Sequence, residues 1–234
     1  MSGSEKQYKI KVSKNGPYIV SGNVPLSEKI ITPKGKGYEY KDGRNFPPDE
    51  KYALCRCGQS ESHPFCDGSH VKVGFNGTER ASQESYEKRA ELIKGPELDL
   101  MDDSRCAFAR FCHREDGKVW GLVGKSGDPK FREEAIKGAG DCPSGRLTVY
   151  DKTGKVIEPE FDPAVEILQD PENGVSGPIF VKGSIPIECA DGQIYEIRNR
   201  AALCRCGRSR NKPFCDATHV SAGFSDKNNS DKQQ

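Results

Sequence analysis

Two short segments carry the residues of this sequence that are best suited to binding metal. In each segment three cysteines and one histidine follow the pattern C-x-C-x8-C-x3-H. Three thiolates and one imidazole form a soft ligand set that suits zinc or an iron–sulfur cluster. The two sets are Cys55, Cys57, Cys66 and His70, and Cys204, Cys206, Cys215 and His219.

The spacing within each set favours a two-iron cluster over zinc. Zinc sites usually separate paired cysteines by two to four residues, whereas one residue separates Cys55 from Cys57. Residues two apart on a strand point to the same side, so this pair could share one iron. Cys66 and His70 are four apart, as neighbours on a helix face are, and would take the other iron. Asp67 would cap that helix. On spacing alone, structural zinc and a role without metal remain the alternatives.

The two segments belong to a longer repeat. Residues 52–75 align without gaps with residues 201–224, and residues 15–26 resemble residues 176–187. Each copy begins with alternating apolar residues typical of strands. The Asp-Gly pairs at residues 42–43 and 191–192 are expected to form tight turns, and the first copy holds about twelve extra residues after Leu26. Units this small bury little apolar surface alone. We therefore expect the copies to pair around a pseudo-twofold axis.

The complete pattern C-x-C-x2-S-x3-P-x-C-D-G-S-H at residues 55–70 resembles the CDGSH iron–sulfur family. The second copy resembles it with Ala217 and Thr218 in place of the Gly-Ser pair. The resemblance implies a [2Fe–2S] cluster in each copy, with the first two cysteines on the buried iron and the third cysteine and the histidine on the outer iron. The chain is more similar to soluble relatives with two motifs, whose halves replace a homodimer, than to membrane-anchored ones.

A further candidate set lies in the middle segment. Cys106 and Cys112 have a C-x5-C spacing, and Cys142 is followed by proline, as is the last ligand of ferredoxin runs. This segment resembles divergent single-cluster ferredoxin-like domains, which implies a third iron–sulfur cluster. Only three cysteines are present, and His113 is a candidate fourth ligand. The alternative is that these thiols pack as small apolar groups.

Three other residues are interpreted as structural. Cys189 has no cysteine counterpart in the first repeat and is expected to be a buried thiol. His63 lies within the first ligand loop, but Lys212 takes its place in the second, which argues against a ligand role. Trp120 is expected to anchor the core of the middle segment.

The overall expectation is an α+β protein: two small β-rich units with short helices and an α/β ferredoxin-like insert. The middle segment should contain a helix near residues 86–94 and another near residues 129–137, with Asp128 as N-cap and Gly138 just beyond its end. Residues 146–151 have strand character. The predicted units are residues 7–80, 81–170 and 171–225, with a tail at residues 226–234.

Net charge and the distribution of apolar residues exclude some classes of function. The 234 residues carry a net charge of +1, which provides no strong field for nucleic acid or an anionic membrane. No apolar stretch is long enough to cross a bilayer, and the N-terminal residues do not resemble a signal peptide. We therefore expect a cytoplasmic monomer that transfers electrons or clusters to redox or cluster-acceptor proteins and is not an enzyme. The alternative is an oxidoreductase with a substrate site in the middle segment.

Overall fold

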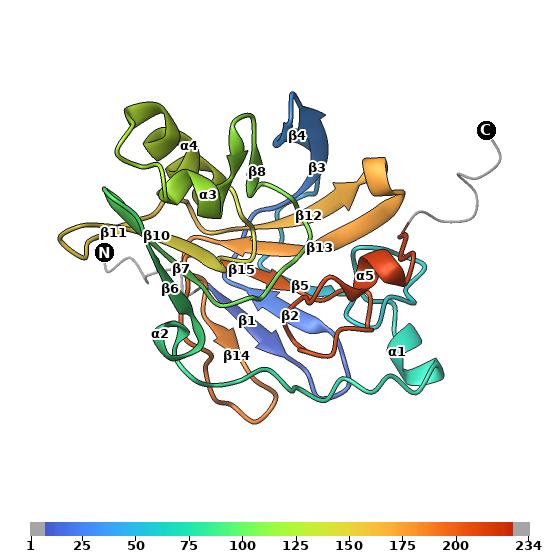
Figure 1. Cartoon of the computed structure of the whole chain (residues 1–234). Coiled ribbons are helices and arrows are strands. Elements are labelled where there is room, and N and C mark those ends of the chain that lie inside the picture. The colour runs from blue at the N-terminus through green and yellow to red at the C-terminus, as the bar shows by residue number, and fades with distance from the viewer. Residues whose placement is uncertain (1–7, 227–234) are drawn as a thin grey trace, which may run out of the picture.

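Strands from the two repeats interlock at the centre of the protein (Figure 1). The computed structural model describes residues 8–226, so residue 7 and most of the expected tail, residues 227–234, lie outside the described part. In residues 8–226 no helix combines the length and the apolar character that a membrane span requires. The architecture is α+β, as expected.

Two sheets are built from the repeats. The first has the strand order β14-β1-β2-β5 and the second has the order β15-β13-β12-β3-β4. The strands of the first sheet are Lys9–Val12 (β1), Tyr18–Ser21 (β2), Lys51–Leu54 (β5) and Ile187–Glu188 (β14). Those of the second are Leu26–Lys34 (β3), Gly37–Asn45 (β4), Ala164–Asp170 (β12), Val175–Lys182 (β13) and Arg200–Leu203 (β15).

The repeats exchange equivalent strands. β14 of the second repeat pairs in parallel with β1, with Ile187 opposite Ile10. In the same way β3 of the first repeat pairs in parallel with β12, with Leu26 opposite Val165. β12 was expected in the middle segment, but it pairs with β13 and so belongs structurally to the second repeat. Leu26 and Ile187 are matched positions of the repeat, so the expected pseudo-twofold pairing is present. The extra residues of the first copy form the long β3–β4 hairpin.

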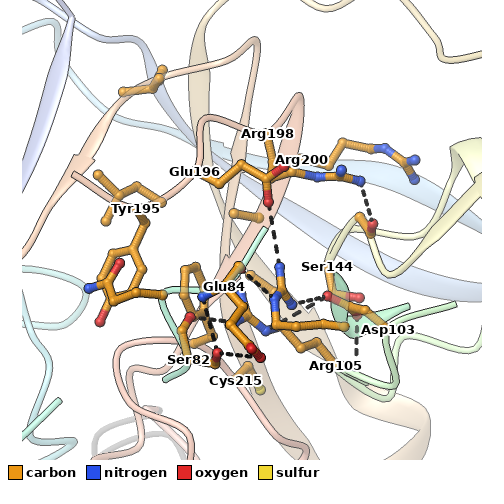
Figure 2. Close-up of a pocket in the computed structure, with 18 residues that line it drawn as sticks. Ser82, Glu84, Asp103, Arg105, Ser144, Tyr195, Glu196, Arg198, Arg200 and Cys215 are labelled. Carbon is orange, nitrogen blue, oxygen red and sulfur yellow. Dashed lines mark hydrogen bonds and ion pairs between the residues drawn. The ribbon is translucent and has the colours of Figure 1, made fainter. Parts of the chain in front are cut away.

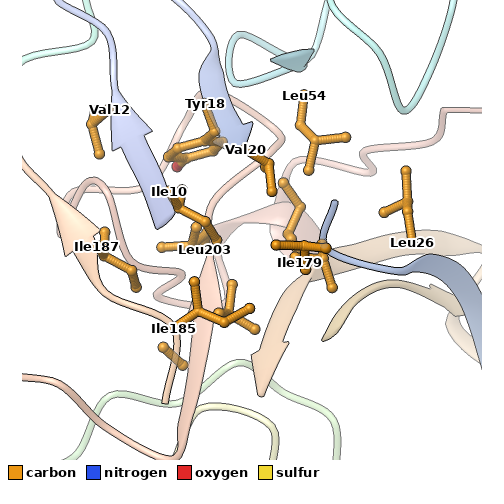
Figure 3. Close-up of a cluster of buried hydrophobic side chains, with 14 of the residues drawn as sticks. Ile10, Val12, Tyr18, Val20, Leu26, Leu54, Ile179, Ile185, Ile187 and Leu203 are labelled. Carbon is orange, nitrogen blue, oxygen red and sulfur yellow. The ribbon is translucent and has the colours of Figure 1, made fainter. Parts of the chain in front are cut away.

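The main core lies where the two repeats meet (Figure 3). Along β2 burial alternates, so that Tyr18 and Val20 point inward. Side chains of both repeats contribute, including Ile10 and Leu54 from the first and Ile179 and Leu203 from the second. A buried aliphatic side chain contributes about 1.5–3 kcal/mol. This shared core therefore holds the repeats together as one folding unit.

The middle segment forms a third sheet of order β11-β10-β7-β6, covered by two helices. Its elements are α2 (Tyr86–Arg89), β6 (Glu91–Lys94), β7 (Leu98–Asp102), β8 (His113–Arg114), β9 (Gly117–Lys118), α3 (Val119–Val123), α4 (Pro129–Gly140), β10 (Leu147–Asp151) and β11 (Val156–Ile157). A 3₁₀ turn, η1 (Pro171–Asn173), follows β12. Trp120 packs on this core and its Nε1 donates a hydrogen bond to Asp102 (3.0 Å).

Local expectations were partly wrong. The helix expected at residues 86–94 is shorter and ends at Arg89. Residues 91–94 form strand β6 instead, because they pair with β7. Gly138 does not end its helix but lies inside α4, where a Cβ atom would meet Val119 at 2.7 Å. Asp128 caps α4 as predicted, accepting from the Lys130 N–H (2.9 Å). Residues 42–43 lie within β4, whereas the predicted turn at residues 191–192 is present.

Asp226 is fixed in the structure although we had assigned it to the tail. Its carboxylate pairs with the guanidinium of Arg205, and both side chains are almost fully buried. It also accepts hydrogen bonds from Ser176 Oγ (2.6 Å) and Gln169 Nε2 (3.1 Å). Arg205 in turn donates from Nε to Gly177 O (2.7 Å). The chain is therefore anchored up to this residue.

We expect Asp226→Asn to destabilise the protein by about 3 kcal/mol or more, because it leaves the buried Arg205 without its counter-charge. Urea denaturation measures the free energy of unfolding. Asp191→Asn, which changes an exposed carboxylate in the turn after Cys189, is the matched control. Equal stability of the two variants would contradict an essential role for the buried pair.

Candidate metal centres

Each four-residue set forms a cradle at the end of a repeat strand. In the first cradle, Cys55 directly follows β5, and its N–H donates to Pro64 O (2.8 Å). The N–H of Cys66 donates to Ala53 O (2.9 Å). These two bonds tie the returning loop to the strand that carries the first cysteine. The cradle is therefore held by backbone contacts that do not depend on a bound group.

The four side chains of the first cradle form two contacting pairs. The Sγ atoms of Cys55 and Cys57 are 3.7 Å apart, and Cys66 Sγ lies 3.4 Å from His70 Nδ1. The second cradle repeats this division, with 3.6 Å between the Sγ atoms of its first two cysteines and 3.4 Å between its third cysteine and its histidine. The structure therefore brings the eight residues selected from sequence together as four contacting pairs, two in each cradle.

Asp67 does not occupy the predicted N-cap position, which belongs to Gly68, but its side chain ties the loop together, and the helix is shorter than expected. Its carboxylate accepts from the N–H groups of Ser69 (2.9 Å) and Glu61 (2.8 Å). The backbone N–H of Glu61, followed by that of Ser69, lowers the pKa of Asp67. Helix α1 spans Ser69–Lys72, so His70 is helical while Cys66 precedes the helix. In the second cradle α5 spans Thr218–Ser221.

The two cradles meet back to back. A Cβ atom on Gly58 would lie 2.7 Å from Cys206 O, and a Cβ on Gly207 would lie 2.3 Å from Cys57 O. Each glycine follows the second cysteine of its own cradle and contacts the backbone of the corresponding cysteine in the other. Tyr18 of the first repeat also donates to Cys204 O (2.8 Å) in the second cradle. The inner sides of the two sites therefore share one packed junction.

The outer sides of the cradles differ in exposure. Cys215 and His219 of the second cradle are each 3% exposed, whereas Cys66 and His70 of the first are half-buried. Burial, followed by the positive charge of Arg205, lowers the pKa of His219 to about 4. The outer side of the second cradle is therefore shielded from solvent, whereas the outer side of the first cradle is accessible to solvent.

Residues of the middle segment produce this difference. Arg105 lies over the ring of Phe214 at 4.4 Å, and Ala107 packs with Cys215 in a small apolar cluster. Cys106 is close enough to act electrostatically on the Cys215 thiol, whose pKa is raised first by burial and then by neighbouring cysteines. The C-x5-C loop therefore covers the second cradle.

A small arginine-lined cavity adjoins this cover (Figure 2). Its volume is about 30 Å³, and Arg89, Arg105 and Arg198 line it together with Cys215. Binding pockets for organic ligands measure about 300–1,000 Å³, whereas a cavity of this size holds water. This cavity therefore has room for water only, whereas a wider, more open pocket of about 360 Å³ shares Arg89, Arg105 and Cys215 with it and is also lined by Cys106.

The three cysteines of the middle segment also approach one another. Burial raises the pKa of the Cys112 thiol to about 11, and the thiols of Cys142 and Cys106 contribute further. Ser144 Oγ lies 3.3 Å from Cys142 Sγ. The charged side chains that act on His113 are Lys118 and Arg110 rather than these cysteines. Cys112 therefore lies within electrostatic range of Cys142 and Cys106, whereas His113 faces cationic side chains.

Sequence reasoning missed several supporting residues. Three residues that contact the second cradle, Tyr18, Arg105 and Ala107, are distant from it in sequence. No local sequence pattern indicates these contacts. His63, interpreted as structural, lies beside Cys55, whose thiol it influences. Cys189 is buried, as expected, and accepts a hydrogen bond from Gln83 Nε2 (3.1 Å).

Ala217 occupies a backbone conformation that favours glycine. Its φ is +68°, and the matched residue of the first cradle, Gly68, has a φ of +87°. We expect Ala217→Gly to stabilise the protein by about 1 kcal/mol, because the left-handed region is costly for a residue with a Cβ atom. The melting temperature and urea midpoint measure this change. Ala222→Gly, at a φ of −83°, is the control and should not stabilise.

Two strand-exchanged repeats, each ending in a cradle of three cysteines and one histidine, define a protein with a pair of related metal sites. Comparison with known families identifies both cradles as the iron-binding zinc finger CDGSH type, matched by residues 15–71 and 176–220. Residues 93–152 match the divergent 4Fe–4S mono-cluster family. The chain therefore combines two regions of the CDGSH type with a segment similar to 4Fe–4S domains, and these matches support iron–sulfur binding. Neither a curated protein nor a solved structure gives a significant match.

Proposed function

We propose that the protein holds one [2Fe–2S] cluster in each CDGSH cradle and passes electrons or clusters to other proteins. Within each cradle the two cysteines nearest the strand would hold the inner iron, and the third cysteine and the histidine would hold the outer iron. The proposed ligands are Cys55, Cys57, Cys66 and His70, and Cys204, Cys206, Cys215 and His219.

The division of each cradle into two contacting pairs carries this proposal. A single zinc ion needs four side chains around one point, and among residues 8–226 no group of three or more His, Cys, Asp or Glu side chains converges in this way. Two separate pairs suit a cluster with two irons. A neutral imidazole in place of a thiolate makes the site less negative, so the potential should lie above that of an all-cysteine ferredoxin.

The exposure of His70 supports transfer from the first cradle, because an outer iron near solvent is accessible to a partner protein. We propose a cytoplasmic monomer, since the strand exchange already pairs the two halves within one chain.

Metal analysis tests the proposal directly. Anaerobically purified protein is expected to contain about four irons and four sulfides per chain, no zinc, and visible absorbance typical of iron–sulfur proteins. Cys66→Ala should reduce both iron and sulfide by half, since only the first cluster loses a ligand. A colourless, zinc-containing protein would contradict the proposal.

A third cluster in the middle segment is the second candidate. It is favoured by the grouping of Cys106, Cys112 and Cys142 within the residues that match the 4Fe–4S family. Seven or eight irons per chain are then expected, and Cys112→Ala should lower that number without affecting the two cradles. Four irons in the wild-type protein would contradict a third cluster.

A further inference from the structure

His63 occupies an unusual place beside the first cradle. It lies between Cys57 and Cys66, immediately before Pro64, and its ring meets that of Phe224 at 5.9 Å with an interplanar angle of 65°. Phe224 packs in turn with Cys204 and Cys206 of the second cradle. The imidazole is therefore held in the junction between the two sites, where its orientation is restricted on both sides.

One nitrogen of this imidazole is buried without a partner. His63 Nε2 is inaccessible to solvent and makes no hydrogen bond to any of residues 8–226. Leaving a buried donor unsatisfied costs about 1–3 kcal/mol, so such an atom indicates a nearby acceptor. The side chain of His63 acts on the thiol of Cys55 as a hydrogen-bonding group and lowers the pKa of Cys55, after the neighbouring thiol of Cys57. Cys55 is a proposed ligand of the first cluster, so the imidazole adjoins that site.

The second cradle has no equivalent group. Lys212 stands at the matched position, and its Nζ donates to Ser209 O (2.8 Å). Its backbone oxygen accepts from the N–H groups of Arg80 (2.8 Å) and Ala81 (3.0 Å). At the matched position of the second cradle, the side chain and the backbone oxygen of Lys212 therefore both form hydrogen bonds with protein atoms, whereas His63 Nε2 does not.

We propose that His63 donates a hydrogen bond from Nε2 to a sulfur of the first cluster and thereby raises the reduction potential of that cluster alone. The inference rests on the proposed [2Fe–2S] cluster in the first cradle. A neutral imidazole carries one N–H, and hydrogen bonds to cluster sulfurs are among the factors that set reduction potentials. Adding one electron makes the sulfurs more negative, so such a bond strengthens on reduction. His63 is therefore a positioning and tuning residue, not a ligand.

The test compares His63→Phe with the wild-type protein in dithionite titrations monitored by visible and EPR spectra at one alkaline pH. Phenylalanine keeps the ring contact with Phe224 but removes the donor. We expect the equilibrium constant for reduction of the first cluster to fall at least tenfold, which is about 59 mV for one electron, while the second cluster is unchanged. His70→Cys identifies which titration wave belongs to the first cluster. His63→Gln, whose amide N–H reaches a similar position, should restore most of the potential.

Pulsed EPR of the reduced wild-type protein gives a second measurement that does not depend on a variant folding. With ¹⁵N-labelled histidine, we expect a weakly coupled nitrogen in addition to the ligand nitrogens of His70 and His219. His63→Phe should lose only that weak coupling. An unchanged first-cluster potential in a fully loaded His63→Phe protein, or no weak coupling in the wild-type protein, would overturn the inference. Absence of iron and sulfide from the wild-type first cradle would instead overturn the proposed function, and metal analysis separates the two results.

Discussion

The first cluster is expected to lose its visible absorbance at a higher pH than the second, whose proposed histidine ligand, His219, has a pKa lowered to about 4. Protonation of a ligand imidazole competes with its bond to iron. His70 is half-buried, so protons and water reach it directly. His219 is 3% exposed, and burial, together with the positive charge of Arg205, disfavours its imidazolium form. A lower pH is therefore needed to displace it.

Stopped-flow absorbance and iron release during a pH jump from about 8 to 5 measure this difference. A fast phase that removes half of the absorbance is expected for the first cluster, while the second cluster keeps its absorbance at pH 5. His70→Cys should remove the fast phase and lower the potential of the first cluster, because a thiolate restores a negative charge. His219→Cys should leave the fast phase unchanged. Loss of both clusters at one rate, or no effect of His70→Cys, would show that His70 does not control the acid sensitivity.

Gly58→Ala and Gly207→Ala are expected to destabilise the protein by about 2–5 kcal/mol each and to impair loading of both cradles. The φ angles of these glycines are +74° and +76°. An added Cβ atom would meet the backbone of Cys206 or Cys57 at less than 3 Å. Backbone atoms cannot move aside as a flexible side chain can, so the ligand cysteine of the opposite cradle must shift. A change in one repeat should therefore affect the metal site of the other.

Gly74→Ala provides the matched control. Gly74 has a φ of +59°, but no atom lies within 4 Å of an added Cβ. This variant should lose about 1 kcal/mol for the backbone conformation alone and retain full iron content. Urea denaturation and iron analysis of the three variants separate the backbone cost from the contact between cradles. Equal behaviour of Gly58→Ala and Gly74→Ala would refute the tight junction.

The candidate ligands and the repeat could be predicted because each is defined by a short, continuous stretch of sequence. Each set, such as Cys55 to His70, lies within sixteen residues, and the repeated pattern restricts the chemistry. The α+β class followed from apolar alternation in strands such as β2. Pairing was also predictable, since one repeat alone buries little apolar surface.

The remaining features depend on contacts between distant segments. Residues 91–94 form a strand because β7 supplies a neighbouring edge, which overrides their local preference. Gly138 lies within a helix because Val119 packs against it. The unequal exposure of the cradles arises from Arg105 and Ala107, which belong to neither repeat. The two cradles share all four ligand positions and ten of sixteen residues, so their different surroundings could not be inferred from the motif.

The exchange of strands between the repeats also determines when the metal sites can be completed during protein synthesis. β1 (Lys9–Val12) leaves the ribosome long before its outer partner, β14 (Ile187–Glu188), has been translated. The loop around Gly58 likewise has no opposing surface until Cys206 has emerged. Long-range pairings of this kind form late, because a long loop must close first. Cofactor insertion should therefore be a post-translational event, and nascent chains stalled before residue 187 should contain no stable cluster.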